Sequence, residues 1–308
     1  MRDAIGKRSL IGCLAILLIV SSGCVDDNAD DPAEGNEMVE EDVVLTEIWR
    51  LEEGLDRPES VIYDAHRSVL YVTNLVGPGD EVDGIGYISR VSLDGEMIDP
   101  QWVDGLNAPK GLAFGGDRLY ATDINTILEI DVDTGEILAR HTIDGDAYLN
   151  DATIGPDGTV FASDSRYSKI YVLRSGGLEV WLEDPNILMP NGVHVVGDQL
   201  FIAAADSTAE EPGTARYLLA ASLSDKSIRA LSARQPVGAL DAVEPDGAGG
   251  LFVTDWGSGH LMHFDGSDLT LLEELGEGAA DVDYVIGEGV LYVPVMMENQ
   301  LIAYQVDL

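Results

Sequence analysis

Cysteine is nearly absent from this sequence, which has only two, Cys13 and Cys24. Cys13 lies inside an apolar run near the N-terminus, and Cys24 follows that run. The rest of the chain therefore has no thiols for a disulfide, a redox centre or a structural zinc site. A domain without such links must be held together by burial of an apolar core, and roughly 260 residues are ample for one large core.

Basic residues are also scarce. The chain has 17 lysine and arginine residues against 56 aspartate and glutamate residues, which gives a formal net charge of −39 at pH 7. Proteins that bind nucleic acids or anionic lipid surfaces use clustered cations to neutralise phosphates. The composition therefore argues against both kinds of partner, and it is typical of a solvated acidic surface.

Long apolar runs are the third shortage. The only one is SLIGCLAILLIVSSG, which is too short for a comfortable membrane span and is typical of the core of a signal peptide. Basic residues precede it, and small residues precede Cys24, as in the bacterial lipobox. We expect residues 1–23 to be a lipoprotein signal peptide and Cys24 to carry the lipid, with ordinary cleavage or retention as an anchor as the alternatives.

This interpretation places the mature protein outside the cytoplasm, held on a bacterial membrane by its lipid alone, either in the periplasm or on the cell surface. Residues 24–44 are acidic and have few apolar side chains, so they cannot bury enough surface to fold. We therefore predict an acidic flexible tether over residues 24–44 and a folded domain over residues 45–308.

Six segments of the domain share one pattern, in which a short apolar strand, a Gly or Asp turn and a second apolar strand follow one another. The segments begin at Pro58, Pro109, Leu149, Pro190, Leu240 and Ala280. Turns such as PDG, GGD and GEG supply the positive φ angles that tight hairpins need. A third strand follows in most repeats and a fourth precedes the next repeat, which gives the ~40–50-residue period of a propeller blade.

The two ends of the domain complement each other. The last repeat ends with QLIAYQVDL and lacks a fourth strand, whereas TEIWRLEEG precedes the first repeat and resembles the fourth strands elsewhere. We therefore predict an all-β fold, a six-bladed β-propeller in which the N-terminal strand closes the last blade. Because ring closure hides the sheet edges, we expect a monomer.

One polar residue recurs at the start of the innermost strand of each repeat, where it should line the axial channel. These residues are Glu59, Lys110, Asn150, Asn191, Asp241 and Asp281. Four of them form a hard oxygen set of the kind that Ca²⁺ prefers, namely Glu59, Asn150, Asn191 and Asp241. A hydrated channel mouth without a metal is the alternative, and the positive charge of Lys110 disfavours a crowded cation site.

At these positions the chain resembles the calcium-dependent propeller hydrolases that include gluconolactonase and regucalcin (senescence marker protein), with diisopropylfluorophosphatase and paraoxonase as more distant relatives. The resemblance spans all six repeats. It rests on Pro58-Glu59, on Asn150-Asp151 followed by PDG, on Pro190-Asn191-Gly192, and on Leu240-Asp241 followed by Asp246-Gly247.

The resemblance implies that Glu59, Asn191 and Asp241 bind a catalytic divalent cation, for which Ca²⁺ is the expected ion, and that Asn150 binds the metal or the substrate. It also implies that Asp151 orients Asn150 or a loop carbonyl. Tyr148 stands where the gluconolactonase branch has an arginine, so the preference for sugar acids does not carry over. The family motif assigns no role to Lys110.

Two functions fit these residues. The first is a metal-dependent hydrolase of small-molecule lactones or related esters, in which the metal acts as a Lewis acid and Asp241 as nucleophile or general base. The second is a non-catalytic extracytoplasmic propeller that binds a protein, a glycan or a small ligand through loops 76–87 and 206–216. Trp256 is expected to line a substrate pocket beside Asp241, whereas His194 is expected to point away from the channel side of Asn191 as a packing residue.

Overall fold

The computed structural model describes residues 43–205, 216–231 and 239–308. The predicted signal peptide (residues 1–23), Cys24, the predicted tether up to residue 42 and most of the 206–216 loop lie outside the described residues. The first described strand, β1 (Val44–Leu51), begins one residue before the predicted start of the domain.

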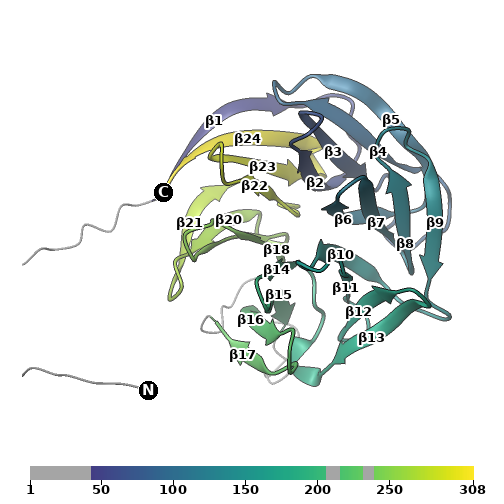
Figure 1. Ribbon diagram of the computed structural model, residues 1–308. Coiled ribbons are helices and arrows are strands. Elements are labelled where there is room, and N and C mark those ends of the chain that lie inside the picture. Colours follow the sequence, from purple (N-terminus) through teal and green to yellow (C-terminus); the bar gives the residue numbers. More distant parts are fainter. Residues whose placement is uncertain (1–42, 206–215, 232–238) are drawn as a thin grey trace, which may run out of the picture. The chain divides into compact units, whose positions relative to one another are not determined.

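The described chain folds into six four-stranded antiparallel sheets arranged as a ring (Figure 1). Blade 1 contains β2 (Pro58–Asp64), β3 (Val69–Asn74), β4 (Gly86–Ser92) and β5 (Met97–Leu106), and blade 2 contains β6 (Pro109–Gly115), β7 (Arg118–Asp123), β8 (Thr126–Asp131) and β9 (Ile137–Thr142). Blade 3 contains β10 (Leu149–Ile154), β11 (Val160–Asp164), β12 (Lys169–Arg174) and β13 (Gly177–Glu183). Within each of these blades the strands pair in chain order, and the first strand lies nearest the centre of the ring.

The remaining three blades follow the same plan. Blade 4 contains β14 (Val193–Val196), β15 (Gln199–Ala205), β16 (Arg216–Ser222) and β17 (Ile228–Ala230), and blade 5 contains β18 (Leu240–Pro245), β19 (Leu251–Asp255), β20 (His260–Phe264) and β21 (Leu269–Glu274). Blade 6 contains β22 (Asp283–Val285), β23 (Val290–Val295), β24 (Gln300–Asp307) and β1. The predicted six-bladed β-propeller is therefore confirmed.

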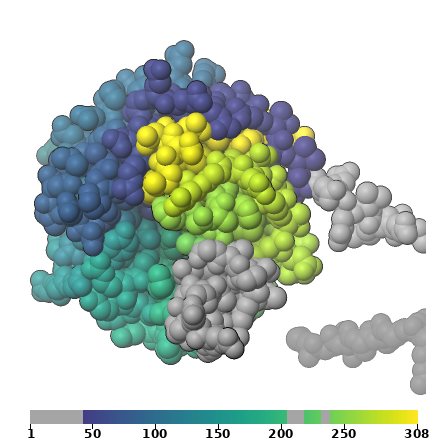
Figure 2. Space-filling view, turned by 180° about the vertical axis from the view of Figure 1, so that it is seen from behind, coloured from purple at the N-terminus to yellow at the C-terminus, as the bar shows by residue number. Residues whose placement is uncertain are grey.

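The N-terminal strand closes the last blade, as predicted. β1 pairs antiparallel with β24, from Val44 opposite Asp307 to Leu51 opposite Leu301. Figure 1 shows purple β1 beside yellow β24, and the opposite view in Figure 2 shows the purple and yellow ends of the domain in contact. The last blade thus takes one strand from the start of the chain and three from its end.

The apolar core lies between neighbouring blades. One cluster joins Tyr71 and Ile88 of blade 1 to Leu119 and Leu128 of blade 2, all of them fully buried. Burying an aliphatic or aromatic side chain of this size stabilises the fold by roughly 1.5–3 kcal/mol. Trp102 on β5 packs on Tyr71 with ring centroids 4.7 Å apart, so an outer-strand tryptophan extends this contact.

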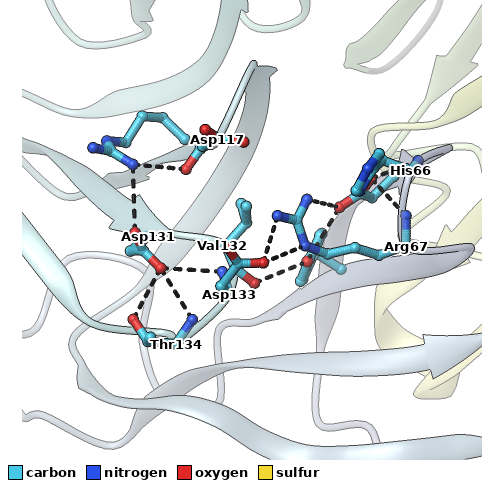
Figure 3. A network of polar contacts seen from close by, with 10 residues as sticks. His66, Arg67, Asp117, Asp131, Val132, Asp133 and Thr134 are labelled. Atoms are coloured by element: carbon cyan, nitrogen blue, oxygen red, sulfur yellow. Dashed lines mark hydrogen bonds and ion pairs between the residues drawn. The ribbon is translucent and has the colours of Figure 1, made fainter.

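Polar contacts at the turns link the same two blades. Arg67, in the turn between β2 and β3, forms ion pairs with Asp64 of its own blade and with Asp133 of blade 2, at 2.9 and 2.6 Å (Figure 3). The Asp133 side chain is mostly exposed, so its ion pair contributes little to stability compared with the apolar core.

Helical structure in the described residues consists of two single 3₁₀ turns, η1 (Pro185–Ile187) and η2 (Met296–Glu298). Neither helix in this part of the chain has the length and apolar character needed to cross a membrane.

Candidate functional site

The predicted ring residues lie in irregular stretches of the innermost strands. In β2, β6, β10 and β18 the pairing with the second strand shifts register at Pro58/Val61, Pro109/Leu112, Leu149/Ala152 and Leu240/Val243. Glu59, Lys110, Asn150 and Asp241 lie inside these four shifts. Because such a bulge interrupts the regular pairing, it re-aims a side chain away from the normal strand alternation.

A hydroxyl group on the second strand satisfies the backbone beside three of these bulges, those of β2, β10 and β18. Thr73 Oγ1 accepts a hydrogen bond from Ser60 N, Ser163 Oγ accepts one from Asp151 N, and Thr254 Oγ1 accepts one from Ala242 N, at 2.9 to 3.0 Å. Thr122 Oγ1 instead donates to Asn150 O at 2.6 Å. The hydroxyls replace ladder hydrogen bonds that the bulges break, since a buried polar backbone group needs a partner.

The residue that follows each of these Thr or Ser residues in the sequence accepts a hydrogen bond from the loop that leads into the same blade. The side chains of Asn74, Asp123, Asp164 and Asp255 accept hydrogen bonds from the backbone N–H groups of Asp56, Ala108, Tyr148 and Ala239, at 2.9, 2.8, 3.1 and 2.8 Å. These N–H groups lie two or three residues before a ring residue. The sequence analysis missed this role, although a Thr or Ser followed by Asn or Asp recurs at the end of the second strand in four blades.

A close backbone approach places Asn191 beside Asp241. Gly192 N donates to Asp241 O at 2.9 Å, and a β-carbon at Gly192 would lie 2.0 Å from that oxygen. Only glycine fits at this position. Asn191 therefore sits next to the bulge of β18.

A cavity of about 350 Å³ opens where the innermost strands begin. It is lined by Arg57, Glu59, Leu75, Gly79, Lys110, Tyr148, Asn150, Asn191, Ala239, Asp241, Trp256 and Met296. The structure thus brings together the four predicted metal ligands with Lys110, Tyr148 and Trp256. Sequence reasoning did not single out Arg57.

Two predicted residues do not line this cavity. Asp281, the sixth ring residue, and Asp151 line a second cavity of about 190 Å³ formed by later residues of the innermost strands. Asp281 Oδ2 accepts a hydrogen bond from Ser60 Oγ at 2.8 Å, and Asp281 N donates to Glu59 O at 2.9 Å. Asp281 therefore lies in the second cavity and not in the first, because this backbone bond and the Ser60 contact hold it against the strand that carries Glu59.

Asp151 makes other contacts than those expected of a residue that orients Asn150 or a loop carbonyl. Its two carboxylate oxygens accept hydrogen bonds from Ala152 N at 2.6 Å and from Val193 N, in the next blade, at 2.7 Å. Asp151 consequently links the innermost strands of blades 3 and 4. The side chain of Asn150 instead donates to Ser165 Oγ at 3.1 Å.

Three oxygen atoms of the cavity are buried and have no hydrogen-bond partner among the described residues. They belong to the side chains of Glu59 (Oε2), Asn150 (Oδ1) and Asn191 (Oδ1). An unsatisfied buried acceptor costs on the order of 1–3 kcal/mol. Carboxylate and amide oxygens are ligands that hard divalent cations prefer, so the orphaned atoms fit an oxygen-rich cation site.

The charges of the cavity also fit a cation. Burial, with the neighbouring carboxylates of Asp241 and Asp281, raises the pKa of Glu59 well above its usual value, and Lys110 opposes this. Burial, with Asp281, raises the pKa of Asp241 well above its usual value, while a hydrogen bond with Asn191 opposes it. A bound cation would favour the ionised forms of both carboxylates.

A cation site here would be built from two carboxylates and two amides. In the described part of the chain no group of three or more His, Cys, Asp or Glu residues is arranged to hold a metal ion. The amide oxygens of Asn150 and Asn191 would therefore complete the ligand set that the carboxylates alone do not provide.

Lys110 is a buried cation inside the cavity, with only 1% of its surface exposed. Its ammonium donates hydrogen bonds to Gly79 O at 2.9 Å and Ala108 O at 3.1 Å, and lies 4.4 Å from the centroid of the Tyr148 ring. Burial lowers the pKa of Lys110 to about 8, and the carboxylate of Glu59 opposes this shift. Lys110 is therefore held by carbonyls and an aromatic face rather than by a direct ion pair.

His194 lies outside the candidate site. It lines the second cavity, where its Nδ1 lies 2.8 Å from Glu244 Oε2. His194 therefore points away from the cavity that contains Asn191, as expected, and it is paired with Glu244, although it lines the second cavity. Another histidine, His263, pairs with Asp246 at 2.9 Å at the end of a turn and is remote from the candidate site.

The fold is a six-bladed β-propeller with a polar cavity at the start of its innermost strands. The family model for the SMP-30/gluconolactonase/LRE-like region matches residues 57–276, and the chain belongs to this family. The resemblance inferred from the ring residues is thereby confirmed. No curated protein matches the chain.

Solved structures of similar fold include a gluconolactonase from Xanthomonas campestris, with a TM-score of 0.65 and 16% identity over 85% of this chain and 89% of that chain. A catalytically inactive virginiamycin B lyase from Staphylococcus aureus, solved with quinupristin, has a TM-score of 0.60 and 13% identity over 86% and 99% of the two chains. A nidogen/laminin complex also matches, with a TM-score of 0.58 and 20% identity over 71% and 86%. At these identities the likeness shows the shared propeller fold.

Proposed function

We propose that this protein is a metal-dependent hydrolase of lactones or related esters. One observation carries the proposal, namely the three orphaned oxygens of Glu59, Asn150 and Asn191, which line one cavity with the carboxylate of Asp241. A plain hydrated channel would satisfy these acceptors with water, but it would not explain why two carboxylates share a buried site. The membership of the family is consistent with a lactonase-type propeller.

In this proposal Glu59, Asn150, Asn191 and Asp241 hold one divalent cation, expected to be Ca²⁺, through their side-chain oxygens. When bound, the cation supplies Lewis-acid polarisation of the scissile carbonyl and favours negative charge on its oxygen. As general base, Asp241 takes the proton of an attacking water, the water oxygen bonds to the carbonyl carbon, and the ester C–O bond breaks as the proton passes to the leaving alkoxide. As nucleophile, Asp241 forms an acyl intermediate with loss of the same alkoxide, and water then hydrolyses that intermediate.

The other walls of the cavity position the substrate and limit its contact with water. Leu75 and Met296 belong to an apolar cluster that also contacts Trp256, and all three residues line the cavity. This apolar side suits the carbon skeleton of a lactone ring, while the polar side carries the reacting groups.

Calcium binding and turnover test the proposal together. After chelator treatment, calorimetry of the wild type is expected to show one calcium site, and lactone hydrolysis is expected to require calcium. Asp241→Asn and Glu59→Gln should abolish both, because each removes a charged ligand, whereas the exposed control Asp94→Asn should change neither. Turnover retained in Asp241→Asn or Glu59→Gln would sink the hydrolase proposal, and no divalent-ion binding under saturating calcium would favour a binding module.

We also propose that the mature protein is a monomer held outside the cytoplasm by a lipid on Cys24, in agreement with the small residues that precede this cysteine. Cys24→Ala is expected to move the protein from the detergent phase to the aqueous phase in a phase-partition assay. The same distribution for both proteins would contradict the lipid anchor.

A further inference from the structure

Two cations of the candidate site lack a carboxylate partner. Five arginines of the domain form ion pairs with aspartate or glutamate, namely Arg50, Arg67, Arg90, Arg118 and Arg166. Arg57 and Lys110 form none with any described residue, yet both line the cavity. Lys110 is buried and Arg57 is partly buried, and burying a charge without a charged partner is costly, so these two cations call for an explanation.

The guanidinium of Arg57 has an edge without an oxygen acceptor. Its Nη1 donates to Gly77 O, but Nη2 meets only Met296 Sδ, at 3.7 Å, and Nε is buried with no partner among the described residues. The Nε and Nη2 hydrogens of arginine are parallel and match the two oxygens of a carboxylate. Met296 covers this edge with a flexible thioether, which a polar ligand can displace.

The backbone of Arg57 is held in an unusual conformation. Its φ angle is 54°, in the left-handed region that non-glycine residues rarely adopt. Asn299 Oδ1 accepts a hydrogen bond from Arg57 N at 2.8 Å, and Leu75 N donates to Arg57 O at 3.1 Å. Strained residues of this kind cluster at ligand sites, where the surrounding contacts maintain them.

Lys110 lines the same cavity as Arg57, and its ammonium has one N–H group that donates no hydrogen bond to a described residue. An ammonium group has three N–H donors, and the two carbonyl contacts of Lys110 account for two of them. The Nζ atom lies 4.4 Å from the centroid of the Tyr148 ring, and Lys110 lines the cavity, so these contacts fix the position of the ammonium beside it.

We propose that Arg57 and Lys110 together bind a carboxylate of the substrate, so that the preferred substrates are lactones or esters that carry a negatively charged group. The inference rests on the proposed function for the reaction, but the recognition of the carboxylate can be measured without turnover. The competing explanation is that both cations only anchor the segment around Gly77 and Gly79, whose carbonyls they contact.

Matched pairs of an acid and its amide separate these explanations. Tetrahydrofuran-2-carboxylate and tetrahydrofuran-2-carboxamide are ligands that cannot be hydrolysed, and the corresponding 5-oxo compounds are lactone substrates of the same shape. Calorimetry on the calcium-loaded protein gives the ratio of the dissociation constants of the acid and the amide that cannot be hydrolysed. The ratio of kcat/KM for the lactone acid and the lactone amide gives the preference in turnover. The wild type is expected to favour each carboxylate by about tenfold or more, which corresponds to ~1.4 kcal/mol.

Variants of the two cations are expected to lose this preference. Arg57→Gln and Lys110→Met should each lower the carboxylate-to-amide ratio by about tenfold while leaving the amide values nearly unchanged. Arg57→Lys, which keeps the charge but not the paired edge, should retain part of the preference and guards against a folding defect in Arg57→Gln. The control Arg166→Gln should leave the ratio unchanged, because Arg166 lies near Tyr148 but is paired with Asp146.

Each outcome decides one point. Equal values for the acid and the amide in the wild type would overturn the inference, and so would an equal loss for both compounds in the variants, which indicates that the cations only anchor the loop. Hydrolysis of lactones without a carboxylate preference would overturn the inference and leave the hydrolase proposal standing. A carboxylate preference in binding that the variants abolish, with no lactone hydrolysed, would support the inference and sink the hydrolase proposal.

Discussion

Asp241 and Asp283 are two carboxylates of the channel, and their surroundings favour different protonation states. Asp241 lies beside the orphaned oxygens of the candidate site, where a cation would favour its ionised form. Asp283 instead lines the second cavity with Glu244, His194 and Asp281. Burial, with the charge of Glu244, raises the pKa of Asp283 to about 8, although a hydrogen bond from Tyr63 N opposes the shift.

The raised pKa of Asp283 predicts a loss of stability with rising pH. The folded protein keeps the Asp283 proton up to about pH 8, whereas the unfolded chain releases it near the ordinary value of 3.8. The stabilisation is therefore complete below about pH 4 and is lost as the pH rises through about 8. Asp283→Asn, which resembles the protonated acid, should gain stability over the wild type between pH 5 and pH 8, by on the order of 1 kcal/mol per pH unit.

Urea unfolding of both proteins at pH 5, 6.5 and 8 checks this prediction, and the exposed Asp94→Asn should show no such trend. Because His194, Glu244 and Asp281 line the same cavity, the variant-minus-wild-type difference is the quantity to compare. A difference that stays constant or shrinks with rising pH would contradict the raised pKa of Asp283.

Among the elements, the bulged innermost strands depend on their second strands. Thr254 on β19 accepts a hydrogen bond from Ala242 N and donates one to Ala280 O, both at 2.9 Å, and so connects blades 5 and 6 beside Asp241. The hydroxyl therefore supports the position of a proposed metal ligand without touching the cavity.

Thr254→Val removes this hydroxyl with little change in shape, and it leaves two buried backbone groups without their partner. We expect the free energy of unfolding to fall by roughly 1–3 kcal/mol. Calcium affinity should also fall, because Asp241 precedes Ala242 and loses part of its support. Urea unfolding and calorimetry measure the two effects, with the exposed Thr270→Val in the same blade as the matched control. Lower stability with unchanged calcium affinity would mean that the hydroxyl does not position Asp241.

The elements also explain which parts of the site could be predicted. A blade is built from contacts within about 50 residues, so strand alternation and turn residues revealed the six repeats and the ring positions of Glu59 and Asp241. The bulges were not predictable in the same way, because strict alternation assumes an uninterrupted ladder. Asp281 lies outside these four bulges, and its place in the second cavity follows instead from its contacts with Ser60 and Glu59.

At the scale of the whole molecule, contacts between residues far apart in the sequence explain why the repeats did not predict the role of Arg57. Arg57 precedes the first ring residue by two positions, but its left-handed backbone depends on Asn299 at the other end of the domain. No local pattern predicts that contact. Closure by β1 was predictable, by contrast, because a missing fourth strand at one end and a surplus strand at the other leave one arrangement that hides both edges.

Closure should consequently dominate the stability of the ring. β1 covers the edge of β24, and its Trp49 also reaches blade 1, where Nε1 donates to Leu93 O at 2.7 Å. Trp49 packs on Tyr292 of β23 with ring centroids 5.9 Å apart. One strand thus seals blade 6 and ties it to blade 1.

Two truncations test this role. Removal of residues 1–42 should leave the melting temperature of the domain unchanged, because β1 remains, whereas removal of residues 1–51 should lower it by several degrees or more and produce oligomers, because β24 becomes an open edge. Scanning calorimetry and light scattering measure both effects, and a peptide of residues 43–52 added in trans should restore part of the lost stability. Equal melting temperatures for the two truncations would show that the ring holds without its closing strand, and the stability would then have to come from the apolar contacts between blades alone.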